Sequence, residues 1–315
     1  MHKKLLFGAV LLMIALLALE GCGGTQTAVQ STQEPLPTFD IAEETPDAAA
    51  TFREATLYYI SDEGYVVPVR KLIPWEEGIA KACLGYITST PDNDAAAAAM
   101  GLKTVLPSGT RISLSITNGD ALIDLNGLAP LGSKQEEEAM LSAVVDTLTE
   151  FATVDTVTVR CEGRGGSLPN GAELPERSPR RSLNVEDTEL AVSAGSVPAT
   201  LYFPNSSGSL TVPVTRYFGA SPSLYASAAA LIEGPRGRGL MCCFPQGTLL
   251  LGAAMENSVA TINLSEDFRA VADTEGMYTL AYRTLLMTLS ERFDIERLVI
   301  QVNGSVYAPE AITDL

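Results

Sequence analysis

Short segments of alternating apolar and polar residues predict strands in this chain. At 156–162, Val157, Val159 and Cys161 are expected to face inward, and the residues between them outward. The same pattern, bounded by turn residues, predicts strands at 56–60, 65–72, 110–117 and 121–126. The last two are expected to form a hairpin about Asn118-Gly119-Asp120, because Asn-Gly favours a two-residue turn.

Apolar residues at helical spacing predict two helices in the same stretch. The first covers 75–89, with Ile79, Ala82, Cys83 and Ile87 inward. The second covers 136–151 and has a longer apolar stripe. That stripe occurs again later in the chain: positions 140, 141, 144, 145, 148 and 152 match 281, 282, 285, 286, 289 and 293, and every pair is apolar.

This order of segments occurs twice. Residues 55–59 and 66–69 return as 199–203 and 210–214, the Gly-Leu to Gly-Thr segment 101–110 returns as 239–248, and 157–163 returns as 298–304. A repeat of this length predicts two similar domains. Because duplication preserves mostly scaffold, matched positions are expected to support the fold.

The element order predicts an α+β fold class: two tandem two-layer α/β sandwich domains, each with a small mixed sheet and two helices. The first domain is expected at 54–183 with a C-terminal extension, the linker at 184–197 and the second domain at 198–315. The Gly- and Pro-rich segment 164–190 is long for a connection, so it is expected to wrap one domain.

The amino terminus has the pattern of a secretory signal. Lys3 and Lys4 precede an apolar run at 5–19, which ends before Cys22. The sequence Leu-Glu-Gly-Cys at 19–22 resembles the bacterial lipoprotein box, which predicts a signal peptide at 1–21 and a lipid anchor on Cys22. Residues 22–53 are predicted to form a disordered acidic spacer. An uncleaved anchor helix or a secreted protein are the alternatives.

Charge and histidine content exclude several classes of function. The chain has 21 basic and 38 acidic residues and a net charge of −17, so no nucleic-acid partner is expected. Its one histidine, His2, lies in the predicted signal. Histidine-dependent nucleophiles, zinc sites and proton switches are therefore not expected in the mature chain.

Cysteines after position 22 do not form a recognisable site. They lack Cys-x-x-Cys spacing, and the expected role is that of small buried residues; they are Cys83, Cys161, Cys242 and Cys243. Three of them lie where the other copy has a different residue: Cys161 matches Val302, and Cys242-Cys243 match Thr104-Val105. A disulfide is compatible with an extracytoplasmic location, but its pairing stays open.

Few residues suggest a binding site. Asp92-Asn93-Asp94 starts like a calcium loop without its Gly and closing Glu, so Asp92 is expected to stop a helix or form a turn. The segments 165–166 and 234–239 are rich in glycine but lack the residues of a phosphate loop. Arg177, Arg180 and Arg181 form a basic cluster in an acidic chain, either solvated or an interaction patch for an acidic neighbour.

Paired carboxylates could indicate a glycoside hydrolase. However, Asp124 is matched by Asn263, and 136–138 is an acidic helix start, where carboxylates complement the helix dipole. Glu150 and Glu291 match each other but have no second matched carboxylate nearby. We therefore expect no enzyme activity, no cofactor and no metal.

The linked motifs resemble one known family. They are Leu-Tyr-Tyr/Phe, Val-Pro-Val, Gly-Leu-x-x-x-Leu/Phe-Pro-x-Gly-Thr, Ile-x-Leu, Thr-Leu-Thr/Ser-Glu and a last strand ending in Gly. This order, in both copies, resembles the GerM domain of sporulation and spore-germination proteins. The run of alanines at 95–99 is an insertion in the first copy.

The resemblance implies a lipoprotein on the extracytoplasmic face of the cell membrane of a spore-forming bacterium. GerM domains resemble the ring-building motifs of secretion systems, which implies packing with a channel complex between mother cell and forespore, or self-assembly. The family provides no catalytic residue. The alternative from another class is an envelope lipoprotein that binds a small ligand or a peptidoglycan fragment.

Overall fold

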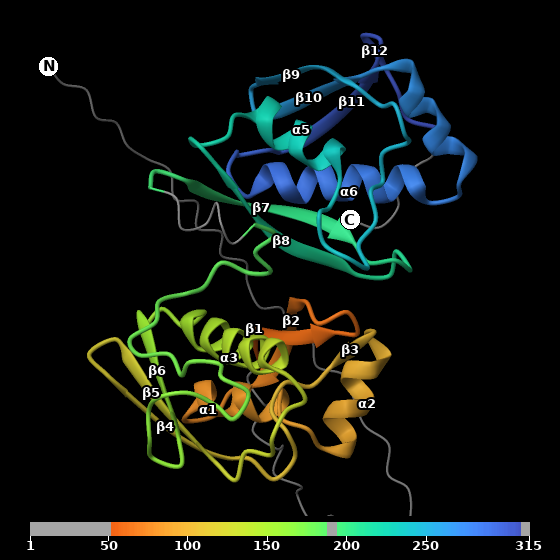
Figure 1. Cartoon of the computed structure of the whole chain (residues 1–315). Coiled ribbons are helices and arrows are strands. Elements are labelled where there is room, and N and C mark those ends of the chain that lie inside the picture. Colours follow the sequence, from red (N-terminus) through yellow and green to blue (C-terminus); the bar gives the residue numbers. More distant parts are fainter. Residues whose placement is uncertain (1–51, 188–193, 310–315) are drawn as a thin grey trace, which may run out of the picture. The chain divides into compact units, whose positions relative to one another are not determined.

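The computed structural model describes residues 52–187 and 194–309 (Figure 1). The predicted signal peptide, Cys22 and all but the last two residues of the predicted spacer lie outside these ranges. The first domain contains, in chain order, β1 (Phe52–Ser61), β2 (Val66–Pro74), α1 (Ile79–Tyr86), α2 (Pro91–Ala99), β3 (Leu102–Lys103), β4 (Arg111–Thr117), β5 (Asp120–Asn126), α3 (Lys134–Thr149) and β6 (Thr156–Cys161).

The second domain repeats this order with small changes. It contains β7 (Val197–Pro204), β8 (Thr211–Phe218), α5 (Leu224–Glu233), β9 (Leu250–Glu256), β10 (Val259–Leu264), the 3₁₀ helix η1 (Glu266–Asp273), α6 (Met277–Ser290), β11 (Arg297–Val302) and β12 (Ser305–Val306). Helix α6 corresponds to α3, and the strands β9, β10 and β11 correspond to β4, β5 and β6.

Each domain contains a small mixed sheet. In the first, β5 pairs with β4 antiparallel and with β6 parallel. In the second, β10 pairs with β9 antiparallel and with β11 parallel, and β12 adds an edge. The predicted α+β class, with small mixed sheets and helices in both halves, is confirmed.

The first hairpin of each domain differs from the expected single sheet. Strand β1 pairs with β2 on one side and with β3 on the other, while β7 and β8 form a separate two-stranded sheet. Helix α3 packs against both β1 and β6, and α6 packs against both β7 and β11. The long helix of each domain therefore contacts two sheets, as Figure 1 shows for α6.

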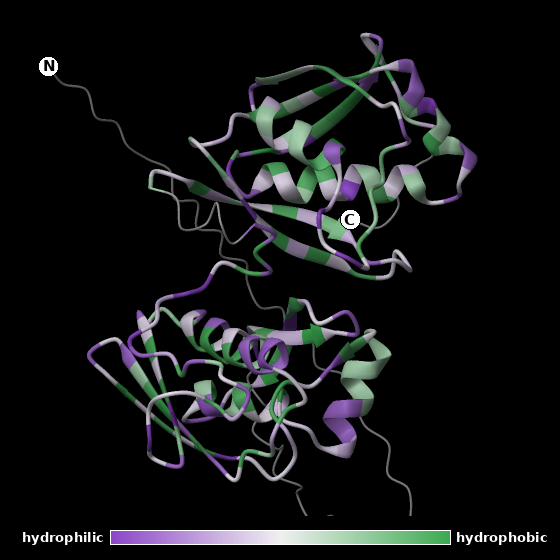
Figure 2. Ribbon diagram, in the orientation of Figure 1, coloured by the Kyte–Doolittle hydropathy of each residue, from purple (hydrophilic) through white to green (hydrophobic). Residues whose placement is uncertain are grey.

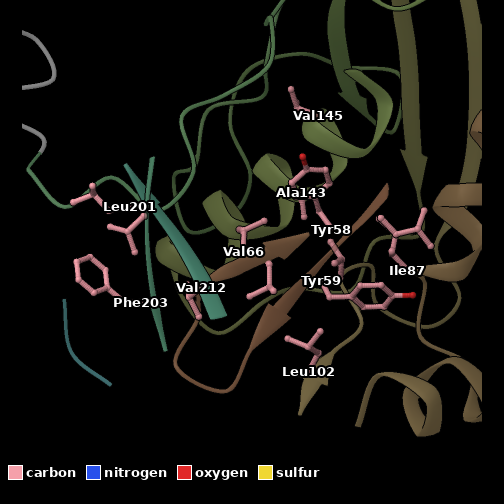
Figure 3. Close-up of a cluster of buried hydrophobic side chains, with 14 of the residues drawn as sticks. Tyr58, Tyr59, Val66, Ile87, Leu102, Ala143, Val145, Leu201, Phe203 and Val212 are labelled. Carbon is pink, nitrogen blue, oxygen red and sulfur yellow. The ribbon is translucent and has the colours of Figure 1, made fainter. Parts of the chain in front are cut away.

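Buried side chains follow the predicted stripes. Met140, Leu141, Val144, Val145 and Leu148 of α3 are buried, as expected. Figure 2 shows hydrophobic and hydrophilic residues mixed along the helices and strands. In Figure 3, Tyr58 and Tyr59 of β1 lie near Ala143 of α3 and Ile87. Among the described residues, no helix is long and apolar enough to cross a membrane.

Two helix predictions need correction. The helix expected at 75–89 is confined to Ile79–Tyr86. It begins only after Gly78, its N-cap residue, because Gly78 has φ 83°, a left-handed conformation outside the regular helix. Asp92 does not stop a helix. It lies in the first turn of α2, where Thr90 Oγ1 accepts a hydrogen bond from the Asn93 backbone N–H.

The segment after β6 packs along the first domain. Ser178 pairs with Val157 in an isolated antiparallel bridge, and Leu168, Ala172 and Leu174 are buried. This packing explains why Thr158, which alternation places on the outer face of β6, is buried instead. Further on, Leu183 and Glu186 exchange backbone hydrogen bonds with β8 of the second domain.

Candidate functional site

The predicted arginine patch lies at the end of the extension, and its members have different surroundings. Arg177 is exposed, and its backbone N–H donates to Thr158 Oγ1 at 3.1 Å. Arg180 pairs with Glu150, with 2.6 Å between Nη2 and Oε1. It also donates to the Tyr58 hydroxyl. Arg180 therefore forms an ion pair with a carboxylate of its own domain.

Arg181 is oriented toward α3. Its backbone N–H donates to Asp146 Oδ1 at 2.8 Å, and its guanidinium lies 3.5 Å from Ser142 Oγ. Burial lowers the pKa of Arg181, against the opposing effect of Asp146. The three arginines thus do not form a single exposed patch, and their role in binding a partner stays a prediction.

Tyr58 connects β1 to the C-terminal end of α3. Its hydroxyl donates to Glu150 Oε1 at 2.6 Å, and its backbone N–H donates to Thr147 Oγ1 at 3.2 Å. Burial raises the pKa of Tyr58 far above its usual value, and the hydrogen bond to Glu150 adds to that effect. The hydroxyl is therefore a stable donor, because its ionised form is disfavoured.

The second domain repeats this arrangement. Tyr202 of β7 donates through its hydroxyl to Glu291 Oε1 at 2.5 Å and through its backbone N–H to Thr288 Oγ1 at 3.0 Å. Burial, followed by the hydrogen bond to Glu291, raises the pKa of Tyr202 as well. Within the described residues Glu291 forms no ion pair, so Arg180 distinguishes the first copy from the second.

We call these two arrangements, Tyr58–Thr147–Glu150 and Tyr202–Thr288–Glu291, the strand–helix clamps. Each joins a strand to a helix by one backbone donor and one side-chain donor. The helix residues of each clamp could be recognised from the sequence, because the motif Thr-Leu-Thr/Ser-Glu occurs in both copies. The tyrosine partner was missed because it lies about ninety residues away along the chain.

A second duplicated contact explains the pairing of Asp124 with Asn263. Asp124 Oδ1 accepts from the Gly163 N–H at 2.9 Å, and Asn263 Oδ1 accepts from the Gly304 N–H at 2.8 Å. Both glycines follow a residue with positive φ in a tight turn. Since the amide serves as well as the acid, this position needs an acceptor and not a titratable group.

Comparison with known proteins identifies the duplicated domain. The Germane family model, described as sporulation and spore germination, matches residues 56–166 and 200–308. The chain belongs to this family. It is 25% identical over 300 residues to the spore germination protein GerM of Bacillus subtilis (strain 168), covering 90% of this chain and 80% of that protein.

A solved structure shares the fold. The tandem GerMN domains of the sporulation protein GerM from Bacillus subtilis align with a TM-score of 0.60 and 24% identity, over 81% of this chain and 92% of that one. The predicted GerM resemblance is therefore confirmed. This chain is a GerM-like protein with two such domains in tandem.

Two buried acids of the first GerM domain lie on α3 and were not anticipated. Glu137, predicted as part of an acidic helix start, accepts from the backbone N–H groups of Asn170 and Ala172 at 2.9 and 3.1 Å. Asp146 is fully buried, and its Oδ2 has no hydrogen-bond partner. Burial raises the pKa of Asp146 to about 6, against the hydrogen bond from Arg181. Both carboxylates hold the extension.

The remaining candidates also have structural surroundings. Asp94 Oδ1 and Oδ2 accept from Thr104 and Ser89. The described cysteines are all free thiols; Cys83 and Cys243 are buried, whereas Cys161 and Cys242 are partly buried. Burial raises the pKa of Cys83 to about 11. Within residues 52–187 and 194–309 there is no group of three potential ligands that could hold a metal.

Proposed function

We propose that this protein is a membrane-anchored extracytoplasmic lipoprotein with a non-catalytic, structural role in sporulation and spore germination. In this role its GerM domains pack with ring-forming components of a channel between mother cell and forespore, or with other copies of the chain. Cys22 carries the lipid anchor. The mature chain needs no cofactor.

The main support for this proposal is that the polar residues matched between the two copies form hydrogen bonds within their own domain. Both strand–helix clamps place the matched carboxylate on a tyrosine of the same domain, and the Asp124/Asn263 position needs only an acceptor. A glycoside hydrolase would need two carboxyl groups facing a substrate. Positions kept in both copies support the fold of each domain instead.

Anchoring through Cys22 is supported by the sequence and by charge. A strongly acidic chain is repelled by an anionic membrane surface. Two acyl chains on one cysteine overcome that repulsion, since two lipid chains give stable attachment where one gives only marginal binding.

The test is the titre of heat-resistant, germination-competent spores from a strain lacking this chain. Complementation with the wild type is expected to restore the titre, and Cys22→Ala is expected not to. Cys161→Ala is the matched control, because it removes another thiol without affecting the anchor. An unchanged titre in the deletion strain would contradict the sporulation role.

A second assay separates assembly from ligand binding and catalysis. The purified mature chain is heated with a panel of peptidoglycan fragments, because a ligand must stabilise the folded form that binds it. We expect no shift in melting temperature and no hydrolysis of purified peptidoglycan. A reproducible upward shift would favour the envelope lipoprotein that binds a glycan.

A further inference from the structure

Strand β4 forms an open edge of the mixed sheet in the first domain. The strand order of this sheet is β4-β5-β6, and among the described residues β4 pairs with β5 alone (Figure 1). The opposite edge, β6, is covered, because Ser178 of the extension forms a bridge with Val157 there. The backbone N–H and C=O groups along the outer side of β4 are therefore available to another strand.

This edge lacks the features that usually keep an exposed strand from pairing. Natural edge strands are commonly protected by a bulge, a proline or a lysine. Residues 111–117 contain no proline and no lysine, and their register with β5 is continuous along the whole strand. In the second domain, the pairing of the matching edge strand β9 with β10 is interrupted by a register shift between Asn263 and Leu264. Strand β4 is thus the more regular of the two edges.

The sequence of β4 is the same in both directions about its central residue. Residues 112–116 are Ile-Ser-Leu-Ser-Ile, centred on Leu114. If two copies of β4 pair antiparallel about a two-fold axis at Leu114, Ile112 lies opposite Ile116 of the second copy. Ser113 then lies opposite Ser115 of the second copy. A two-fold interface requires such self-complementarity, because the same residues form both of its sides.

The aliphatic residues of β4 give this pairing an apolar face. Side chains alternate along a strand, so Ile112, Leu114 and Ile116 share one face of the sheet. Ile116 is 39% exposed, and the residue opposite it on β5 is the small Ala121. In the two-fold arrangement Ile112 of the second copy covers Ile116. The pairing therefore removes apolar surface from water and forms aliphatic cross-strand pairs, which stabilise antiparallel strands.

The charges of β4 are compatible with a second copy as its partner. The whole chain has a net charge of −17, yet β4 contains no carboxylate, and Arg111 is its one charged residue. In the two-fold register Arg111 lies opposite Thr117 of the second copy. Like charges, which destabilise a strand pair when they are directly opposite, therefore do not meet between the two strands.

We propose that β4 is a dimerisation edge, at which two copies of the chain pair antiparallel about Leu114. The two three-stranded sheets then form one continuous sheet across the dimer. Because each copy uses its own open edge, the contact closes on itself and produces a dimer instead of a filament. The inference names the surface for the self-assembly included in the proposed function, and it rests on that function.

Sedimentation velocity over a range of protein concentrations tests this proposal. The full mature chain carries Cys22→Ser, so that it remains free of lipid, and it is expected to shift from monomer to dimer as its concentration increases. Ser113→Lys with Ser115→Lys is expected to keep the chain monomeric, because each new lysine lies opposite a lysine of the second copy. Both serines are exposed, so the fold is expected to tolerate the change.

A charge-swap experiment separates loss of pairing from loss of folding. Ser113→Glu with Ser115→Glu is expected to be monomeric by itself for the same reason as the lysine variant. An equal mixture of the lysine and glutamate variants is expected to form dimers, because each lysine then lies opposite a glutamate. Two monomeric variants that do not associate when mixed would overturn the proposed register.

Ala254→Lys is the matched control, because Ala254 is exposed on β9, the matching edge strand of the second domain. It is expected to leave the dimer unchanged. A parent chain that remains monomeric up to millimolar concentration would overturn the proposal. Dimers that persist in both charged variants, or that are lost in Ala254→Lys, would also overturn it, because they would assign the contact to another surface.

Failure of this inference is distinguishable from failure of the proposed function. Sedimentation reports pairing of the purified chain, whereas the titre of heat-resistant spores reports its role in the cell. A chain that restores the spore titre but sediments only as a monomer refutes the dimerisation edge alone. An unchanged titre in the deletion strain refutes the proposed function, whatever the sedimentation result.

Discussion

At the scale of single residues, hydrogen-bonding capacity explains which side chains match between the two domains. Tyr58 and Tyr202 both donate to a carboxylate at a helix end, and Asp124 and Asn263 both accept from a turn N–H. Where only the first copy carries an acid, as at Asp146, that acid contacts the extension that follows the first domain. The type of side chain at a matched position therefore depends on the hydrogen-bonding groups that surround it in each domain.

Asp146 predicts a specific pH dependence of stability. Burial raises its pKa from 3.8 to about 6, so the folded state binds this proton more tightly than the unfolded chain does. The stability that this provides is fully present below pH 3.8 and is lost as the pH rises through about 6. Asp146→Asn removes the titration.

Denaturant unfolding at a series of pH values measures this effect. The free energy of unfolding of Asp146→Asn minus that of the wild type is expected to increase by about 3 kcal/mol from low to neutral pH, the energy equivalent of the shift. Asp273→Asn, which changes an exposed acid, is the control and should show no such increase. A stability difference between Asp146→Asn and the wild type that does not change with pH would contradict the raised pKa of Asp146.

At the scale of elements, turn geometry fixes the hairpins of the mixed sheets. Asn118 and Gly119 have φ 51° and 80°, and the matching turn between β9 and β10 has Asn257 and Ser258 at 47° and 59°. Positive φ at both central positions defines the turn type that suits the twist of a two-residue hairpin. Glycine tolerates this conformation, whereas serine adopts it at a cost.

The two turns therefore predict opposite effects of substitution. Gly119→Ala is expected to lower the free energy of unfolding by about 1–2 kcal/mol, the cost of a left-handed L-residue. A Cβ there would also collide with the Asp155 carboxylate. Ser258→Gly is expected to leave stability unchanged or raise it by less than about 1 kcal/mol. Calorimetry of both variants tests this, and effects of the same sign would refute the argument.

At the scale of the whole described chain, the segment after β6 belongs to both domains by its contacts. Its first part packs on α3 and β6, and Glu186 near its end forms an ion pair with Arg216 of β8 at 2.7 Å, with both side chains 2% exposed. Arg216 also donates to the carbonyl oxygens of Ala230 and Gly234, each at 2.8 Å. The pair is therefore fully hydrogen-bonded in the interior.

Breaking this pair on one side is expected to be costly. Arg216→Met leaves the Glu186 carboxylate buried without its partner, which typically costs about 3–5 kcal/mol. The double variant Arg216→Met with Glu186→Gln is expected to recover part of this loss, since no unpaired charge remains. Arg236→Met, at a more exposed arginine, is the control. Denaturant unfolding of the wild type and these variants measures the losses. An Arg216→Met variant as stable as the double variant would contradict the prediction.

Much of the fold followed from local patterns. The stripe at 140–148, the alternation at 156–162 and the Asn-Gly turn predicted α3, β6 and the β4–β5 hairpin. Helix α2 was missed because a run of alanines has helical propensity but no apolar periodicity. Helix α1 was predicted too long because apolar spacing does not register the left-handed conformation at Gly78.

The sequence by itself determined the duplication, the α+β class and the family, because these depend on residue type and local spacing. Only the tertiary structure decided which residues share a contact. It paired Tyr58 with Glu150 and buried Thr158 and Asp146 under the extension. Such contacts join residues distant in the chain, and periodicity carries no information about distant partners.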